Sequence, residues 1–303
     1  MDRKKLRGNL MLTLTALIWG ASFVAQSVGN ELVGPFTFNA VRTLLGALTL
    51  LPVIALLDRL RGPQPARTAA EKRRAGKVLW LGGLCCGAAL FAASTMQQVG
   101  ISFTTAGKAG FITALYIVLV PILGIFLGKR APRIVWLCVA VAVAGLFLLC
   151  VKENFSIGKG DLLVLCCALL FAVHILIIDH FSPLVDGVRM SCIQFLVAGL
   201  LGVPLMFWFE TPTFSGILAA WVPICYSGIL SCGVAYTLQI VAQKDTDPTI
   251  ASLLLSLESV FAALSGWVLL HETLTLRELL GCALVFAAII LAQLPPKTKE
   301  IQK

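Results

Sequence analysis

The chain has 303 residues, of which 58% are hydrophobic and only 13% charged, and its mean hydropathy is +0.93. A soluble domain usually carries about twice that share of charged residues, and a soluble surface this apolar would aggregate. The composition therefore excludes a soluble enzyme, a disordered protein and a small secreted module held by disulfides. The apolar residues come in long blocks, which is the pattern of a protein that crosses a membrane many times.

Ten of these blocks are long enough for a transmembrane helix, which needs about 20 apolar residues. We expect them at 9–28, 35–57, 76–98, 104–127, 133–151, 161–179, 188–208, 214–241, 247–270 and 275–294. The blocks lack the alternation of apolar and polar residues that a β-barrel requires. The predicted fold class is therefore an all-α membrane protein with ten transmembrane helices and no room for a soluble domain.

The basic residues predict the orientation, because Lys and Arg concentrate in short cytoplasmic loops. With the N-terminus inside, the inner segments carry 19 of the 24 Lys and Arg residues, and the outer loops carry only Lys152, Lys159 and Arg277. We therefore expect a multi-pass protein of the cytoplasmic or inner cell membrane with both termini in the cytoplasm. The net charge of +9 follows from this bias, and it indicates contact with anionic lipid headgroups of the bilayer, not with nucleic acid.

The chain repeats itself at about half its length. A shift of 152 residues aligns Pro52 with Pro204, and a shift of 146 aligns Gln97 with Gln243. Because five spans return the chain to the opposite side, a second set of five inserts upside down. Inverted repeats are typical of secondary transporters, in which two similar halves let one site face either side. The two expected five-helix repeats are residues 1–151 and 152–303.

Two short motifs carry a family resemblance: Trp19-Gly20 in the first span and the run Leu257–Phe261 in the ninth. With the order of ten short spans, they make the chain resemble the EamA-type transporters of the drug/metabolite transporter superfamily over essentially its whole length. The resemblance implies ten helices, transport of small metabolites and no ATPase activity. Two departures weaken any inference about substrate. Ser259 follows Glu258 where the family often has proline, and Lys129 follows Gly128 where a repeat often ends in Gly-Glu.

Two ionisable residues lie inside expected spans, where a charge costs roughly 2.5–3.5 kcal/mol. Glu258 is near the middle of the ninth span, and Arg42 is about 6 Å outward of the centre of the second. We expect both to face a central cavity, where Arg42 binds an anionic group such as a carboxylate and Glu258 binds a cationic group or a coupling proton. The alternative is a buried ion pair that pins helices together, or solvated groups that do not contact substrate.

The other expected substrate-binding residues are Asn39, Trp19, Gln97, Tyr116 and Tyr236. Asn39 shares the helix face of Arg42, three residues away, and Gln97 lies at the end of the third span. Such amides also bridge helices, and aromatic side chains also serve in packing or as interfacial anchors. For each residue, binding and structural roles both remain open at this stage.

Several other groups have a structural interpretation. We expect Lys108, near the outer end of the fourth span, to extend to the headgroups, and His174 to be either a packed neutral side chain or a proton carrier. The pairs Gly83/Gly87 and Gly124/Gly128 allow close helix contacts within the chain or in a homodimer. The ten cysteines show no metal-binding spacing, so we expect no metal, no other cofactor and no catalytic residues.

The leading hypothesis is a secondary transporter of small organic metabolites or drugs that works by alternating access. We expect it to export amino-acid-like or amphiphilic solutes, driven by the solute gradient alone or by coupling to protons. A channel or a non-transporting membrane subunit is the alternative. An intramembrane enzyme is less favoured, because it would need several His or acidic groups at one depth, and only Glu258 is central.

Overall fold

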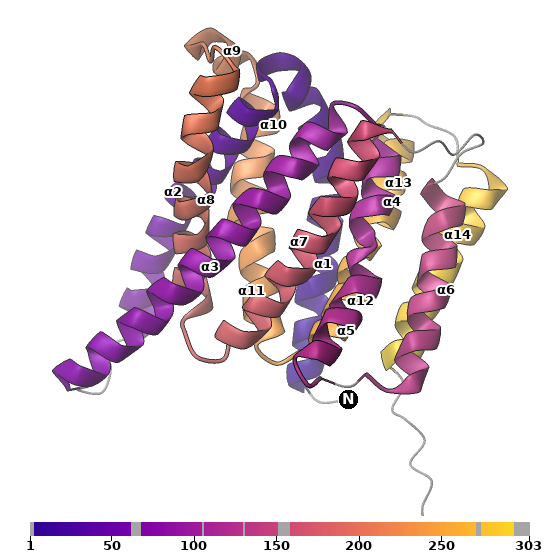
Figure 1. Cartoon of the computed structure of the whole chain (residues 1–303), viewed down its shortest axis with the longest axis horizontal. Helices are drawn as coiled ribbons and strands as arrows, with labels where there is room; N and C mark the ends of the chain where they lie inside the picture. The colour runs from indigo at the N-terminus through magenta and orange to yellow at the C-terminus, as the bar shows by residue number, and fades with distance from the viewer. Residues whose placement is uncertain are drawn as a thin grey trace, which may run out of the picture.

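The computed structural model describes residues 3–61, 68–104, 106–129, 131–150, 158–270 and 274–293. Within these ranges all regular structure is helical, and the helices pack side by side in one bundle (Figure 1). Eight helical segments are long and apolar enough to cross a membrane, and Arg133–Leu149 is a shorter apolar helix. The predicted class, an all-α membrane protein, is confirmed.

The described residues form fifteen helical elements. They are α1 (Arg3–Val33), α2 (Pro35–Arg61), α3 (Ala69–Ile101), α4 (Ala106–Ala114), α5 (Tyr116–Phe126), α6 (Arg133–Cys150), α7 (Lys159–Phe181), α8 (Gly187–Phe209), α9 (Phe214–Ala219), α10 (Trp221–Cys225), the π-helix η1 (Tyr226–Tyr236), α11 (Thr237–Gln243), α12 (Pro248–Leu255), α13 (Leu257–Leu270) and α14 (Leu276–Gln293). The expected fourth, eighth and ninth spans are each divided among consecutive elements, and each of the other seven coincides with one helix.

Polar side chains set several helix starts. Thr68 accepts a hydrogen bond from the backbone N–H of Glu71, and the Glu71 carboxylate accepts one from the Thr68 backbone, so a reciprocal capping box begins α3. Asp186 accepts from the backbone N–H of Arg189 at the start of α8, and Asp247 caps α12 in the same way. These residues satisfy N–H groups that a helix leaves unpaired in its first turn.

The helices pack in a pattern that relates the two halves of the chain. α2 packs along α8, and α6 packs along α14. α1 contacts η1, α11 and α13, while the corresponding helix of the second half, α7, contacts α3, α4 and α5. In Figure 1, α1 rises from the edge that carries the N-terminus, and α7 descends toward that edge. α1 and α7 therefore run antiparallel, as expected of corresponding helices in inverted repeats.

The two expected small-residue pairs have different surroundings. A Cβ atom at Gly83 would lie 2.4 Å from Ile193 of α8, and one at Gly87 would lie 2.6 Å from Val197 of the same helix. The first pair therefore serves close packing inside the chain. A Cβ atom at Gly124 would lie 3.7 Å from the Cβ atom of Lys129, and one at Gly128 would meet no described atom within 4 Å. A homodimer contact at that pair stays a prediction.

Two transmembrane segments break at corresponding positions. Leu115 separates α4 from α5, and its N–H donates to the carbonyl of Ile112 at 3.2 Å, three residues back. Ser256 separates α12 from α13, and the N–H of Ser259 donates to its carbonyl at 3.3 Å. Such tight turns interrupt the regular bond to the fourth residue back. The expected fourth and ninth spans are present as Lys108–Phe126 and Pro248–Ser265, and each contains one tight turn that the sequence did not predict.

The expected eighth span also needs correction. The crossing segment begins at Trp221, because α9 is a separate helix, and eleven residues of the segment form the π-helix η1. Two hydrogen bonds tie η1 to α1: the Tyr226 hydroxyl donates to the carbonyl of Ile18 at 3.1 Å, and the Thr15 hydroxyl donates to that of Ala235 at 3.0 Å. π-helical turns are frequent at functional sites, and η1 contributes to the cavity described below.

Lys108 does not act as the sequence predicted. Its ammonium forms an ion pair with Asp161 of α7 at 2.5 Å, and Asp161 is only 4% exposed. Asp161 also accepts from the Thr104 hydroxyl at 2.7 Å and from the backbone of Gly158 at 2.7 Å. Lys108 therefore ties the fourth span to α7. A second ion pair joins Lys129, which follows α5, to Asp179 near the end of α7.

Replacing Asp161 with alanine is expected to lower the free energy of unfolding by about 2–3 kcal/mol, because one change removes a buried ion pair, a hydroxyl bond and a helix cap. Asp58→Ala is the matched control. Asp58 pairs with Arg189 where both side chains are nearly half exposed, so its loss should cost less than about 1 kcal/mol. Thermal unfolding in detergent measures both. Equal effects of the two changes would contradict a structural role for Asp161.

Candidate functional site

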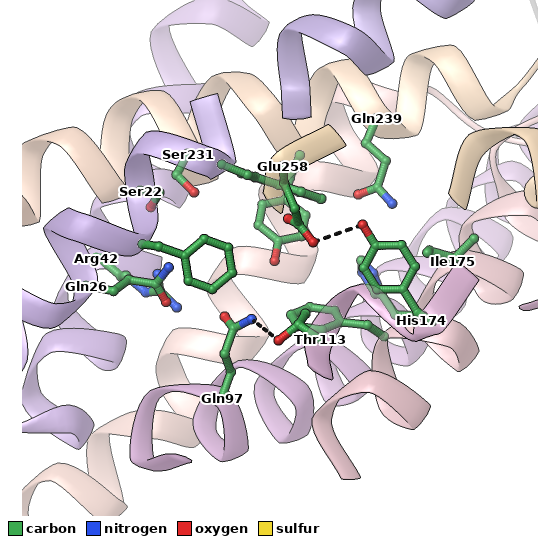
Figure 2. A pocket seen from close by; sticks show the side chains of 15 residues that line it. Ser22, Gln26, Arg42, Gln97, Thr113, His174, Ile175, Ser231, Gln239 and Glu258 are labelled. Atoms are coloured by element: carbon green, nitrogen blue, oxygen red, sulfur yellow. Dashed lines mark hydrogen bonds between the residues drawn. The ribbon is translucent and has the colours of Figure 1, made fainter. Parts of the chain in front are cut away.

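A buried cavity lies between the two halves of the chain (Figure 2). The first half contributes Trp19, Ser22, Phe23, Gln26, Arg42, Gln97, Thr113 and Tyr116. The second half contributes Phe171, His174, Ile175, Ser231, Tyr236, Gln239 and Glu258. The space that the centre of a water molecule can occupy is about 30 Å³, enough for about two waters. The cavity therefore holds little free space in this structure.

The structure brings the sequence-predicted residues together. Six of the seven line this cavity, and they come from helices of both halves: Trp19, Arg42, Gln97, Tyr116, Tyr236 and Glu258. The seventh, Asn39, does not line it but contacts Arg42. The shared position is a finding, whereas the role of these residues in substrate binding stays a prediction.

Arg42 is held in place by Asn39. The Arg42 side chain is 5% exposed, and its Nε and Nη2 atoms donate to Asn39 Oδ1 at 3.1 and 3.0 Å. Asn39 in turn donates through Nδ2 to Ser94 and Thr95 of α3. The guanidinium also lies over the ring of Phe38, 5.5 Å from its centre. Asn39 is therefore a positioning residue for the arginine, not a wall of the cavity.

Glu258 faces the same space from the other half of the chain. Its side chain is 4% exposed, and its Oε1 atom accepts a hydrogen bond from the Tyr116 hydroxyl at 2.9 Å (Figure 2). Glu258 and Arg42 form no ion pair with each other, and neither has an oppositely charged partner among the described residues. The alternative that the two residues pin the helices together as a buried pair is therefore wrong.

Tyr116 and Glu258 occupy corresponding positions at the two helix breaks. They are 142 residues apart, and the same shift aligns Leu115 with Leu257 and Gly124 with Gly266. Tyr116 is the first residue of α5, and Glu258 is the second residue of α13. Paired interruptions in the two halves of a transporter mark its binding site, and here the two interruptions meet through the hydrogen bond between the two side chains.

Four lining residues carry buried polar atoms that have no hydrogen-bond partner in the described part of the chain. These atoms are Trp19 Nε1, Ser22 Oγ, Gln26 Oε1 and Gln239 Oε1. An unpaired buried polar atom costs about 1–3 kcal/mol. Four such atoms belong to residues around this cavity, and five more belong to described residues that do not line it.

Sequence reasoning missed several lining residues, including Ser22, Gln26, Thr113 and Gln239. The internal repeat held a signal for some of them. The 152-residue shift aligns Ser22 with His174 in the sequence, and both residues line the cavity. The 146-residue shift was misleading, because it pairs Gln97 with Gln243. Gln243 instead bonds to the Ile175 carbonyl, and Gln239, 142 residues after Gln97, lines the cavity.

Amides outside the cavity bridge helices. Gln98 donates to the carbonyl of Gln26 at 3.2 Å and bonds to Asn30, which joins α1 to α3. Gln194 of α8 lies 3.0 Å from the ring of His174 in α7. No group of three or more His, Cys, Asp or Glu side chains within the described ranges is arranged to hold a metal ion.

Gly20 allows α1 to approach the backbone of α13 beside Glu258. A Cβ atom at Gly20 would lie 2.6 Å from the Phe261 Cβ atom and 2.7 Å from the backbone oxygen of Glu258. We expect Gly20→Ala to lower the free energy of unfolding by about 1–3 kcal/mol, because backbone atoms cannot yield locally. Thermal unfolding measures the effect.

The matched control for this prediction is Gly76→Ala in α3. A Cβ atom there would meet nothing within 4 Å, and alanine favours a helix over glycine. The control should therefore leave stability unchanged or raise it. A Gly20→Ala protein as stable as the wild type would show that α1 and α13 separate without cost.

The sequence model of the EamA-like transporter family matches residues 6–151 and 158–294. An uncharacterized transporter of Archaeoglobus fulgidus is 32% identical, over 96% of this chain and 87% of that protein. The uncharacterized inner membrane transporter YedA of Escherichia coli strain K12 is 23% identical, over 92% of this chain and 88% of YedA.

One solved structure has the same fold as this chain. Its TM-score is 0.76 at 19% sequence identity, and the match covers 94% of this chain and 96% of that one. The family match in both halves fits the repeated helix packing and the cavity between the halves. These findings identify a multi-pass membrane transporter, and the chain belongs to the EamA-like transporter family.

Proposed function

We propose that this protein is a secondary carrier that exports amino-acid-like or amphiphilic solutes by alternating access. The observation that carries the proposal is one cavity with Arg42 and Glu258 in its wall and no ion pair between them. A zwitterion supplies both missing counter-charges. Its carboxylate matches the planar guanidinium of Arg42, and its ammonium matches the carboxylate of Glu258.

The aromatic residues of the wall support the amphiphilic part of the proposal. The ring centroids of Trp19 and Tyr236 lie 4.4 Å apart, and Phe23 and Phe171 line the same space. Binding sites for small organic solutes combine such apolar surface with a few placed polar groups. The wall therefore offers one surface for an apolar substituent and two charged groups for the ends of a zwitterion.

The small free volume of the cavity bears on how a solute enters. A space for about two waters is too small for an amino acid, so in our proposal the halves separate to admit one. In our proposal residues 1–151 and 152–303 are the two inverted repeats, and their rocking opens the cavity to one side at a time. Both termini lie in the cytoplasm in this proposal.

Glu258 gives the carrier a means of coupling. It is the one acid among the described residues that line the cavity. A carboxylate that has bound a proton has no charge with which to hold an ammonium group. Because a proton and the solute compete for Glu258, export of the solute is coupled to entry of a proton.

Counterflow in proteoliposomes tests the proposal. The panel contains amino acids, nucleosides and cationic dyes, each with and without a proton gradient. We expect trans-stimulated, saturable uptake of a zwitterionic class. The Arg189→Ala protein is the control, because Arg189 lies in an exposed ion pair outside the cavity and should transport normally. Leak without saturation would favour a channel, and uptake of dyes alone would contradict a zwitterion site.

A further inference from the structure

The second half of the chain presents one more polar group to the cavity. We propose that His174 contacts the substrate and selects solutes that bring a hydrogen-bond donor to its ring. This proposal rests on the proposed carrier function and adds a requirement that Arg42 and Glu258 do not impose. His174 is 1% exposed, and it lines the cavity from α7 (Figure 2).

Gln194 fixes the orientation of the His174 ring. His174 Nε2 lies 3.0 Å from Gln194 Oε1, and Gln194 is fully buried. Because an amide oxygen only accepts hydrogen bonds, Nε2 carries the proton. In the neutral ring Nδ1 is then the acceptor. The rings of Phe171 and Tyr236 contact His174 edge-on, with centroids 6.5 and 6.0 Å away, so the ring is held on its sides as well.

The second ring nitrogen of His174, Nδ1, is available to a solute in the cavity. Among the described residues it has no hydrogen-bond partner, and the His174 side chain lines the cavity. With Nε2 bonded to Gln194 and the side chain lining the cavity, Nδ1 is the ring nitrogen that can accept a hydrogen bond from a bound solute.

The internal repeat shows what distinguishes this part of the wall. The 152-residue shift relates Gln194 to Arg42 and His174 to Ser22. In the first half a charged group is held by an amide, since Asn39 accepts from Arg42. In the second half the amide of Gln194 holds an uncharged ring. The cavity therefore has a cationic donor on one side and a neutral acceptor on the other, so a bound solute meets different chemistry at its two ends.

Pairs of solutes that differ by a single donor test the proposal in proteoliposomes. The probes are tyrosine against phenylalanine and threonine against valine, because each pair has similar shape and only the first member has a hydroxyl donor. We expect the wild type to prefer the donor-bearing member of at least one pair by about tenfold or more, because a site built to hydrogen-bond a group rejects the analogue that lacks it. In His174→Phe the preference should disappear.

Two further variants keep the test independent of folding. His174→Asn places a polar atom near the position of Nδ1 and should retain part of the preference. Gln194→Leu releases the ring and should weaken the preference while transport continues. The control is His180→Phe, because His180 lies at the end of α7 and does not line the cavity; it should keep the wild-type ratio.

The outcomes separate this inference from the proposed function. Wild-type counterflow without discrimination within either pair would overturn the role of His174 and leave the carrier intact. Retention of the preference in folded His174→Phe would do the same. Absence of counterflow by folded wild-type protein with every probe would overturn the zwitterion carrier itself, and the role of His174 would fall with it.

Discussion

Arg42→Ala is expected to abolish counterflow while the protein still folds. Arg42 is the one cation among the described residues that line the cavity, and Asn39 accepts hydrogen bonds from it. Removing one partner of a buried charge pair costs about 2–5 kcal/mol of binding, which corresponds to a loss of affinity of at least about 30-fold. Saturable uptake of the best wild-type solute measures the effect.

Arg42→Lys separates charge from shape. Lysine keeps the positive charge but lacks the planar fork that bonds a carboxylate through two N–H groups. We expect partial transport with a raised KM, between the wild type and Arg42→Ala. Thermal unfolding of each variant establishes that the protein is folded. Normal transport by a folded Arg42→Ala protein would remove Arg42 from the site.

The sequence predicted the fold well because the signals for membrane spans are local. A block of apolar residues predicts a span, and the cost of a buried charge identifies Arg42 and Glu258 without knowledge of their neighbours. Six of the seven expected site residues line one cavity for the same reason. Polar and aromatic groups in otherwise aliphatic helices are few, and they gather where two halves of the bundle meet.

Other features depend on partners that are distant in sequence. Lys108 pairs with Asp161, which is 53 residues away, and the local pattern around Lys108 gives no indication of that contact. The break at Leu115 contains neither proline nor glycine at its centre. The next residue, Tyr116, contacts Glu258, which is 142 residues away. Neither contact was predictable from composition or spacing within one span.

The eighth span has a further feature that the sequence does not predict. Its hydropathy is that of an ordinary helix, and the sequence does not distinguish a π-helix from an α-helix over Tyr226–Tyr236. Contacts with a distant helix accompany this geometry. Tyr226 donates to α1, and Thr15 of α1 donates to Ala235. The same segment contributes Ser231 and Tyr236 to the cavity.

Glu258→Gln is expected to uncouple transport from protons. Glutamine has nearly the same shape, and its oxygen still accepts a hydrogen bond from Tyr116, which bonds to Glu258 in the wild type. Because glutamine carries no charge, it cannot bind a proton and an ammonium group in turn. A proton gradient should therefore no longer drive accumulation, and counterflow should persist at about a tenth of the wild-type affinity or less, in line with the loss of one charged hydrogen bond.

The pH profile distinguishes coupling from simple loss of affinity. Wild-type counterflow should fall as the pH is lowered, because a proton on Glu258 removes the charge that holds the solute. In Glu258→Gln counterflow should not depend on pH. Asp58→Asn is the control, because Asp58 lies in an exposed ion pair with Arg189 away from the cavity, and it should keep the wild-type profile. A Glu258→Gln protein that still accumulates solute against a gradient when protons flow would place the coupling group elsewhere. The proposed competition at Glu258 would then be wrong, even if the solute still binds beside Arg42.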